Sequence, residues 1–214
     1  MAVACEGAGE ETPKLVNSKG EKLQRGFTIR SGRSSLVDGV AAIVCTSDEV
    51  EGARQVRLNT AEATRVVLRG CERGGVGCNS PRAAAREVVT GAVEFILVFD
   101  PADLTRVFWL IEERGGGQGV FVTVECNGGR ETYRIRGGAL SAIAPVNRRT
   151  KTLTAEFEQK EGKQTLTEYL NGKGEKVKDV FEAEGEGEEK LALKEIGFSS
   201  TEELKFEEEV EIVT

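Results

Sequence analysis

The chain has 214 residues, of which 39% are hydrophobic and 30% charged, and its formal net charge is −7 at pH 7. A chain of this length and apolar content is not disordered as a whole, and it needs no disulfides to hold its core. It contains no histidine, which excludes Ser-His-Asp triads, Cys-His dyads, histidine-ligated zinc and the usual proton carrier at neutral pH. We therefore expect a protein that is not an enzyme and has no catalytic residue, metal site or cofactor.

The sequence shows no sign of a membrane span or a secretion signal. Glu94, Asp100 and Asp103 interrupt the longest apolar run, which stays well short of the ~18 residues that a spanning helix needs. Residues 1–7 have neither a basic segment nor an apolar segment of the kind that directs a chain to secretion. We expect the chain to be made and to fold in the cytosol.

Most local patterns in the first half of the chain predict β-strands. The count of 26 Gly against only four Pro fits a fold with many turns. Short alternating or β-rich apolar segments predict strands at residues 26–30, 38–45, 55–58, 64–69 and 93–99.

One segment departs from this pattern and predicts a helix over residues 101–114. Asp100 can cap the helix, Pro101 suits its first position, and Gly115 is a stop signal. Apolar residues recur at helical spacing, at Leu104, Val107, Phe108 and Ile111. Trp109, the only tryptophan, falls beside this stripe and is expected in the core.

The clearest hairpin joins residues 119–126 to residues 130–136. Asn127 and Gly128 supply the positive φ angles that a tight hairpin turn demands. Alternation of Thr, Val, Leu or Phe with charged residues predicts later strands at residues 150–158, 164–170 and 203–214.

The charge is distributed unevenly along the chain. Residues 151–214 contain 9 Lys, no Arg and 18 Asp or Glu, a net charge of −9. Residues 1–150 have a net charge of +2, and 17 of their 20 basic residues are Arg. The acidic quarter is either a solvated surface or one charged face of an assembly.

Possible chemical motifs are few. Cys71 and Cys78 flank a glycine-rich segment, and their spacing fits free thiols, a disulfide that closes this loop or, less well, a metal site. Residues 73–77 and 115–119 are glycine-rich turns, because neither precedes a helix that could hold a phosphate. Residues 184–189 form a charged loop and not a pair of catalytic carboxylates.

The order of elements in residues 87–158 is more specific. An apolar β segment leads through Phe99-Asp-Pro-Ala-Asp103 into the predicted helix, and the hairpin and Gly137-Gly138 follow. A strand then ends at Ala144-Pro-Val-Asn147, before the threonine-rich strand at residues 150–158. This order resembles the tail tube proteins of long-tailed bacteriophages and the related tubes of bacterial injection systems, over about 70 residues.

The resemblance implies a mainly β fold: a β-sandwich or barrel with one flanking helix at about 101–114. It places a long loop or β-arm between residues 30 and 86. Residues 1–158 would form the tail-tube-like domain, and residues 159–214 would add acidic C-terminal strands to the same domain.

The function implied by the resemblance is structural. The chain would be made in the host cytoplasm and become part of the virion tail, where copies of it form stacked homo-oligomeric rings beside other tail proteins. Genomic DNA would pass through the acidic channel of these rings without tight binding. The alternatives are another virion β-protein, such as a decoration or head-tail joining protein, and a non-enzymatic binding module.

Overall fold

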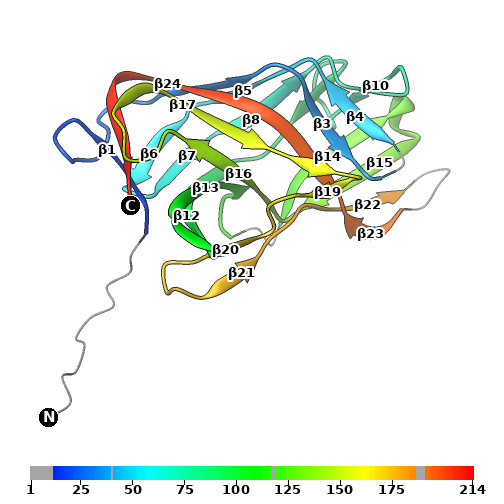
Figure 1. Ribbon diagram of the computed structural model, residues 1–214. Coiled ribbons are helices and arrows are strands. Elements are labelled where there is room, and N and C mark those ends of the chain that lie inside the picture. The colour runs from blue at the N-terminus through cyan, green and yellow to red at the C-terminus, as the bar shows by residue number, and fades with distance from the viewer. Residues whose placement is uncertain (1–11, 40, 117–118, 187–190) are drawn as a thin grey trace, which may run out of the picture.

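A computed structural model describes residues 12–39, 41–116, 119–186 and 191–214. Figure 1 shows antiparallel strands that curl into a half-barrel, with the long strand β24 (Gly197–Val213) running along its upper side. The described strands form one sheet of 22 strands and a separate two-stranded hairpin, β18 (Gln159–Lys160) with β19 (Lys163–Gln164). The prediction of a mainly β fold is therefore confirmed.

We call the larger part of the sheet the main run. Its hydrogen-bonded order is β11 (Glu87–Val89), β8 (Arg65–Arg69), β5 (Ser47–Glu51), β2 (Thr28–Ser31), β24, β17 (Thr150–Phe157), β16 (Gly138–Ala144), β13 (Asp103–Glu113), β12 (Val93–Asp100), β7 (Thr60–Ala63) and β6 (Arg54–Arg57). At its margins, β1 (Lys14–Asn17) pairs with the end of β24, and β20 (Glu168–Leu170) pairs with β12 and with β21 (Lys176–Lys178).

The smaller part, the end run, also starts from β24. Its order is β24, β3 (Ser34–Val37), β4 (Ala42–Cys45), β9 (Glu72–Arg73), β10 (Val76–Asn79), β14 (Val120–Cys126), β15 (Glu131–Arg136), β22 (Glu182–Glu186) and β23 (Leu191–Glu195). β24 links the two runs because residues 197–199 pair with β3 and residues 200–205 pair with β17.

The core fills the space between the two runs. A series of phenylalanine rings crosses it, with ring-centroid distances of 4.7, 6.2 and 5.1 Å between successive members. The series runs through Phe121, Phe181, Phe198 and Phe157. Because these rings come from both runs and from the segment before β22, apolar burial ties distant parts of the chain together.

The predicted helix at residues 101–114 is wrong, because this segment forms strand β13. Within the described residues the one helical element is a 3-10 turn at Asn127–Gly129. The Asp-Pro signal serves a hairpin turn instead of a helix start: Asp100 Oδ1 accepts the N–H of Ala102 at 2.8 Å. Asp100 does accept a backbone N–H group, as the sequence indicates, but such a bond stabilises a turn as well as the start of a helix.

β13 was misread because it is buried on both faces. Trp109 and Ile111 face the core between the two runs, where the tryptophan is confirmed as a core residue. Phe108 and Leu110 face a second apolar cluster, which Tyr169 and other residues beside β20 cover. A strand buried on both faces reads as a continuous apolar run, and such a run contains helical spacings by chance.

The remaining strand predictions agree with the structure more closely. The hairpin of β14 and β15 forms, and both Asn127 and Gly128 have positive φ, at 54° and 66°. The long loop or β-arm expected in residues 30–86 does not appear, since this segment forms strands β3 to β10 that pair within the sheet in its described part. Among the described residues, no helix has the length and apolarity to cross a membrane.

Candidate functional site

The four cysteines in the described part of the chain form two disulfides, Cys45–Cys71 and Cys78–Cys126, and Cys5 lies outside the described residues. Of the alternatives for Cys71 and Cys78, free thiols and a disulfide between the two are therefore both wrong, because each of them bonds to another cysteine. Cys78 and Cys126 stand opposite each other in the pairing of β10 with β14. Disulfides persist in oxidising surroundings, so these bonds are unusual for a protein that stays in the cytosol.

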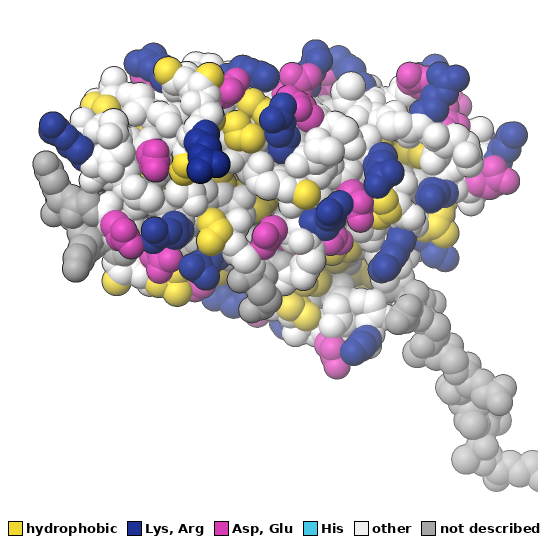
Figure 2. Space-filling view, turned by 180° about the vertical axis from the view of Figure 1, so that it is seen from behind, with side chains coloured by type: hydrophobic (Ala, Val, Ile, Leu, Met, Phe, Trp, Pro, Cys, Tyr) yellow, Lys and Arg dark blue, Asp and Glu magenta, His cyan; other side chains and the backbone are white. Residues whose placement is uncertain are grey.

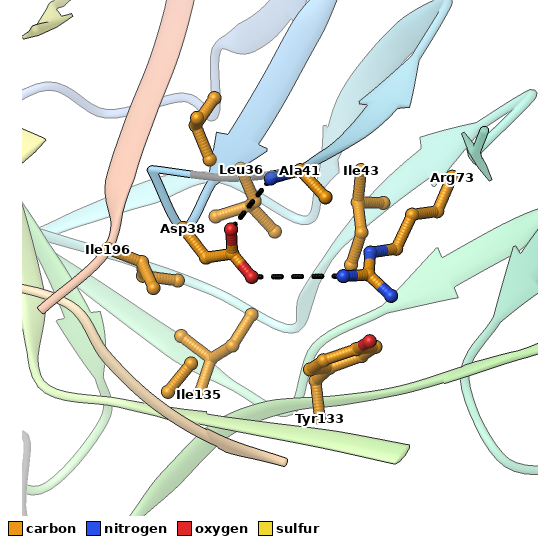
Figure 3. A pocket seen from close by; sticks show the side chains of 10 residues that line it. Leu36, Asp38, Ala41, Ile43, Arg73, Tyr133, Ile135 and Ile196 are labelled. Carbon is orange, nitrogen blue, oxygen red and sulfur yellow. Dashed lines mark hydrogen bonds and ion pairs between the residues drawn. The ribbon is translucent and has the colours of Figure 1, made fainter. Parts of the chain in front are cut away.

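A small pocket lies among strands of the end run, and Figure 3 shows the side chains that line it. Its volume is about 20 Å³. Its floor is apolar and comes from several strands of the end run, with Leu36, Ile43, Ile135, Ala183 and Ile196 among its residues. Asp38, Arg73 and Tyr133 form its polar rim, and in Figure 3 the carboxylate of Asp38 points toward the guanidinium of Arg73.

Charge pairing holds the rim together. Arg73 Nη1 lies 2.6 Å from Glu131 Oε2, and Arg73 Nη2 lies 3.9 Å from Asp38 Oδ2. The Tyr133 hydroxyl donates to the same Glu131 oxygen at 3.0 Å, and its ring centroid lies 5.1 Å below the guanidinium carbon. Lys194 donates to the backbone oxygen of Asp38. The positive charges of Arg73 and Lys194 thus balance the negative charges of two nearby carboxylates around the pocket.

The rim groups are poorly suited to catalysis. Burial raises the pKa of Tyr133 to about 12, and its hydrogen bond to Glu131 acts in the same direction. This tyrosine therefore stays protonated at neutral pH and cannot serve as a base. Arg73 and Glu131 are both engaged in ion pairs, so the pocket offers a balanced rim over an apolar floor. At about 20 Å³ the pocket has room for about one water molecule, so it can receive only the tip of a larger partner.

Each disulfide has one member of the Arg73–Glu131 ion pair as a close neighbour. Arg73 follows Cys71 by two positions, on β9. Glu131 stands opposite Cys126 in the pairing of β14 with β15. Sequence reasoning missed this site, because Arg73 and Glu131 are 58 positions apart and only the fold brings them together.

The other sequence motifs are mostly structural. Gly74 and Gly75 have positive φ, at 59° and 83°, which confirms the turn predicted at residues 73–77. In the charged segment at residues 184–189, Glu184 and Glu186 lie on β22 and pair with arginines of β15 at 3.1 and 2.9 Å. The rest of that segment and part of residues 115–119 lie outside the described residues.

The fold and the pocket define the class of protein: a disulfide-bonded, mainly β protein with a small polar-rimmed pocket at one end. Comparison with protein families, with curated proteins and with solved structures finds no match to this chain.

Proposed function

We propose that the chain is a structural β-protein that works by assembling with further copies of itself. In its more specific form the proposal is a tube subunit of a long-tailed bacteriophage, as the resemblance over residues 87–158 implies. The pairing of Arg with carboxylates and the absence of histidine leave catalysis without a candidate set of residues.

The observation that carries the proposal is the free edge of strand β23. This strand pairs with β22 on one side, and in the described part of the chain no strand pairs with its other side. Leu193, near its middle, is 54% exposed. An unpaired edge presents backbone N–H and C=O groups to any strand of a neighbour, and natural proteins usually protect such edges with charge, Pro or a bulge.

The more specific form is supported by strand order alone. β12, β14, β15, β16 and β17 follow one another as the strands of the resemblance do. The helix of the family has no counterpart here, because β13 takes its place. The two disulfides add a feature that the resemblance did not imply.

The charges of the chain bear on the expected passage of DNA. Most of its ion pairs join Arg to Asp or Glu within the chain, as between Arg30 and Glu49 at 2.7 Å and between Arg65 and Glu51 at 2.8 Å. Figure 2 shows basic and acidic side chains interspersed on one face, with hydrophobic ones scattered among them. Because most of the arginines in the described part of the chain are paired with carboxylates, we expect weak DNA binding. Sub-micromolar affinity at physiological salt, falling steeply as salt rises, would contradict this.

The test of assembly compares two exposed leucines. Leu193 lies on the free edge, and Leu104 is similarly exposed, at 56%, beside the turn between β12 and β13. A lysine placed on an edge strand opposes edge pairing. In light scattering over a range of protein concentrations, Leu193→Lys should shift the protein toward monomer, while Leu104→Lys should behave as the parent. Equal behaviour of both variants would remove β23 as the assembly surface.

A second candidate function is a non-enzymatic binding module, which the pocket in Figure 3 favours. The same experiment separates the two functions. A parent chain that stays monomeric at all concentrations argues for the binding module and against the structural subunit.

A further inference from the structure

The inference concerns two acidic residues that neighbouring strands bring together inside the protein. In the pairing of β5, β2 and β24, Ser31 stands opposite both Asp48 and Glu202. The alternation of a strand places these residues on the same face as Ile29, which is fully buried. Both carboxyl groups consequently point into the core, where Asp48 is 3% exposed and Glu202 is 2% exposed.

Neither carboxyl is fully satisfied by the surrounding protein. Asp48 Oδ2 accepts hydrogen bonds from the hydroxyls of Ser31 and Ser200, the second at 3.4 Å. Asp48 Oδ1 and Glu202 Oε2 are buried without a hydrogen-bond partner in the described part of the chain. A buried carboxylate left in this condition is strongly disfavoured, so such a group tends to take up a proton.

Both residues line the same internal cavity, of about 30 Å³, between the main run and the end run. Thr90 is the only other polar residue of its lining, and the remainder is apolar, with Leu68, Phe121 and Phe198 among its members. The surface of this cavity is apolar, so a water molecule there would lack the polar partners that it needs. The two carboxyl groups are therefore left without solvent as well as without a hydrogen-bond partner for Asp48 Oδ1 and Glu202 Oε2 in the described part of the chain.

Among the described residues that line this cavity, none is basic, so no positive side chain there compensates the pair. The strands that face it across the cavity, β8, β11, β13 and β14, present apolar residues there. Burial raises the pKa of both groups, and for Glu202 the nearby charge of Asp48 adds to the effect. The nearby hydroxyl groups of Ser31, Ser200 and Ser34 and the backbone of Ser31 oppose the rise in pKa for Asp48 alone. Glu202 is therefore the group that holds a proton more firmly.

We propose that Asp48 and Glu202 together form a proton-binding site that stays protonated at neutral pH and fastens β24 to β2 and β5. Glu202 lies three residues after Ser199, close to the point where β24 leaves its pairing with β3 for its pairing with β17. Loss of the proton would leave two negative charges side by side at this crossing. The site thus makes the junction of the two runs sensitive to alkaline pH.

The direction of the pH effect follows from the proton. The folded chain holds the proton more tightly than the unfolded chain. The stabilising contribution of the site is therefore complete at pH values below the ordinary pKa of a carboxyl group. This contribution is lost as pH rises through the higher pKa of the folded state. In the pH range where the folded chain holds one proton more than the unfolded chain, the equilibrium constant for unfolding should rise by up to about tenfold per pH unit.

The test measures urea unfolding of the oxidised chain from pH 5 to pH 9. Glu202→Gln keeps the shape of the side chain but cannot ionise, so this variant should lose the alkaline decline that the parent shows. Glu112→Gln is the matched control, since Glu112 is another buried carboxyl, on β13, and does not line this cavity. In Glu112→Gln, the part of the alkaline decline in unfolding free energy that comes from Asp48 and Glu202 should remain. A decline of equal size in the parent and in Glu202→Gln would overturn the proposal.

A second measurement keeps the proposal testable if Glu202→Gln fails to fold. In the Glu112→Gln chain, infrared spectroscopy at pH 8 should show the C=O stretching band of a protonated carboxyl, and Asp48→Asn added to this chain should shift or abolish it. Absence of any protonated carboxyl band in the folded Glu112→Gln chain at that pH would overturn the proposal.

Discussion

The two ends of the sheet hold their strands together in different ways. In the end run, two disulfides fix β4, β10 and β14, and ion pairs around Arg73 surround a small pocket. On the opposite flank, β13 has no covalent support and is instead packed between two apolar layers. One chain thus uses two buried disulfides within the main core in one region and a second apolar layer in a region that has no disulfide.

The free edges of the two ends also differ. β21, at the margin of the main run, has three residues with a lysine at each end, and these charges discourage pairing with a neighbour. β23, the last strand of the end run, has five residues and an exposed Leu193. We therefore place assembly at β23, because it is longer than β21 and presents an exposed leucine in place of a lysine at each end.

The largest expected effect tests the apolar side of this comparison. Phe108 is 2% exposed and faces the second cluster, so Phe108→Ala should destabilise the fold by about 3–5 kcal/mol. Chemical unfolding measures the change. Leu104→Ala, on the same strand but exposed, is the control and should leave the unfolding free energy nearly unchanged. A parent-like value for Phe108→Ala would mean that the second layer does not support β13.

A somewhat smaller effect on stability tests the contribution of the disulfides in the end run. Replacing Cys78 and Cys126 together by alanine removes the bond with the longer sequence separation, 48 positions against 26 for Cys45 and Cys71. The expected loss is about 2–4 kcal/mol, slightly larger than that for the shorter separation. Hydrogen exchange should rise first in β10 and β14 and leave β12 and β13 protected. Uniform loss of protection would show that the two ends do not differ in this way.

The smallest expected effect concerns the pH dependence of stability that Glu112 of β13 causes. Burial raises the pKa of Glu112 to about 7, and the charges of Asp179 and Glu94 add to the rise. The folded chain therefore holds this proton more tightly than the unfolded chain, and stability should fall as pH rises from about 4.5 to 7. Glu112→Gln should reduce this fall and melt a few degrees higher than the parent at pH 8. A lower melting temperature for the variant at that pH would contradict the prediction.

The sequence predicted those elements whose pattern is local. The hairpin of β14 and β15 and the strands β12 and β17 alternate or run apolar between clear turn residues, and they fold as expected. β13 was misread because burial on both faces depends on β20 and its neighbours, which lie some 60 positions further along the chain.

The candidate sites could not be predicted from local pattern. Arg73 and Glu131 meet only through the pairing of β9, β10, β14 and β15. Asp48 and Glu202 are separated by most of the chain, and each looks in the sequence like one more solvated carboxylate. Their burial depends on the register of β2 between β5 and β24, which no single segment encodes.

The central claim is that the chain assembles with copies of itself, and electron microscopy of the purified, oxidised protein at increasing concentration tests it most directly. The account predicts closed rings or stacked rings that form a hollow tube, and their loss in Leu193→Lys. A field of single monomeric particles at every concentration, for the parent chain as for the variant, would contradict it.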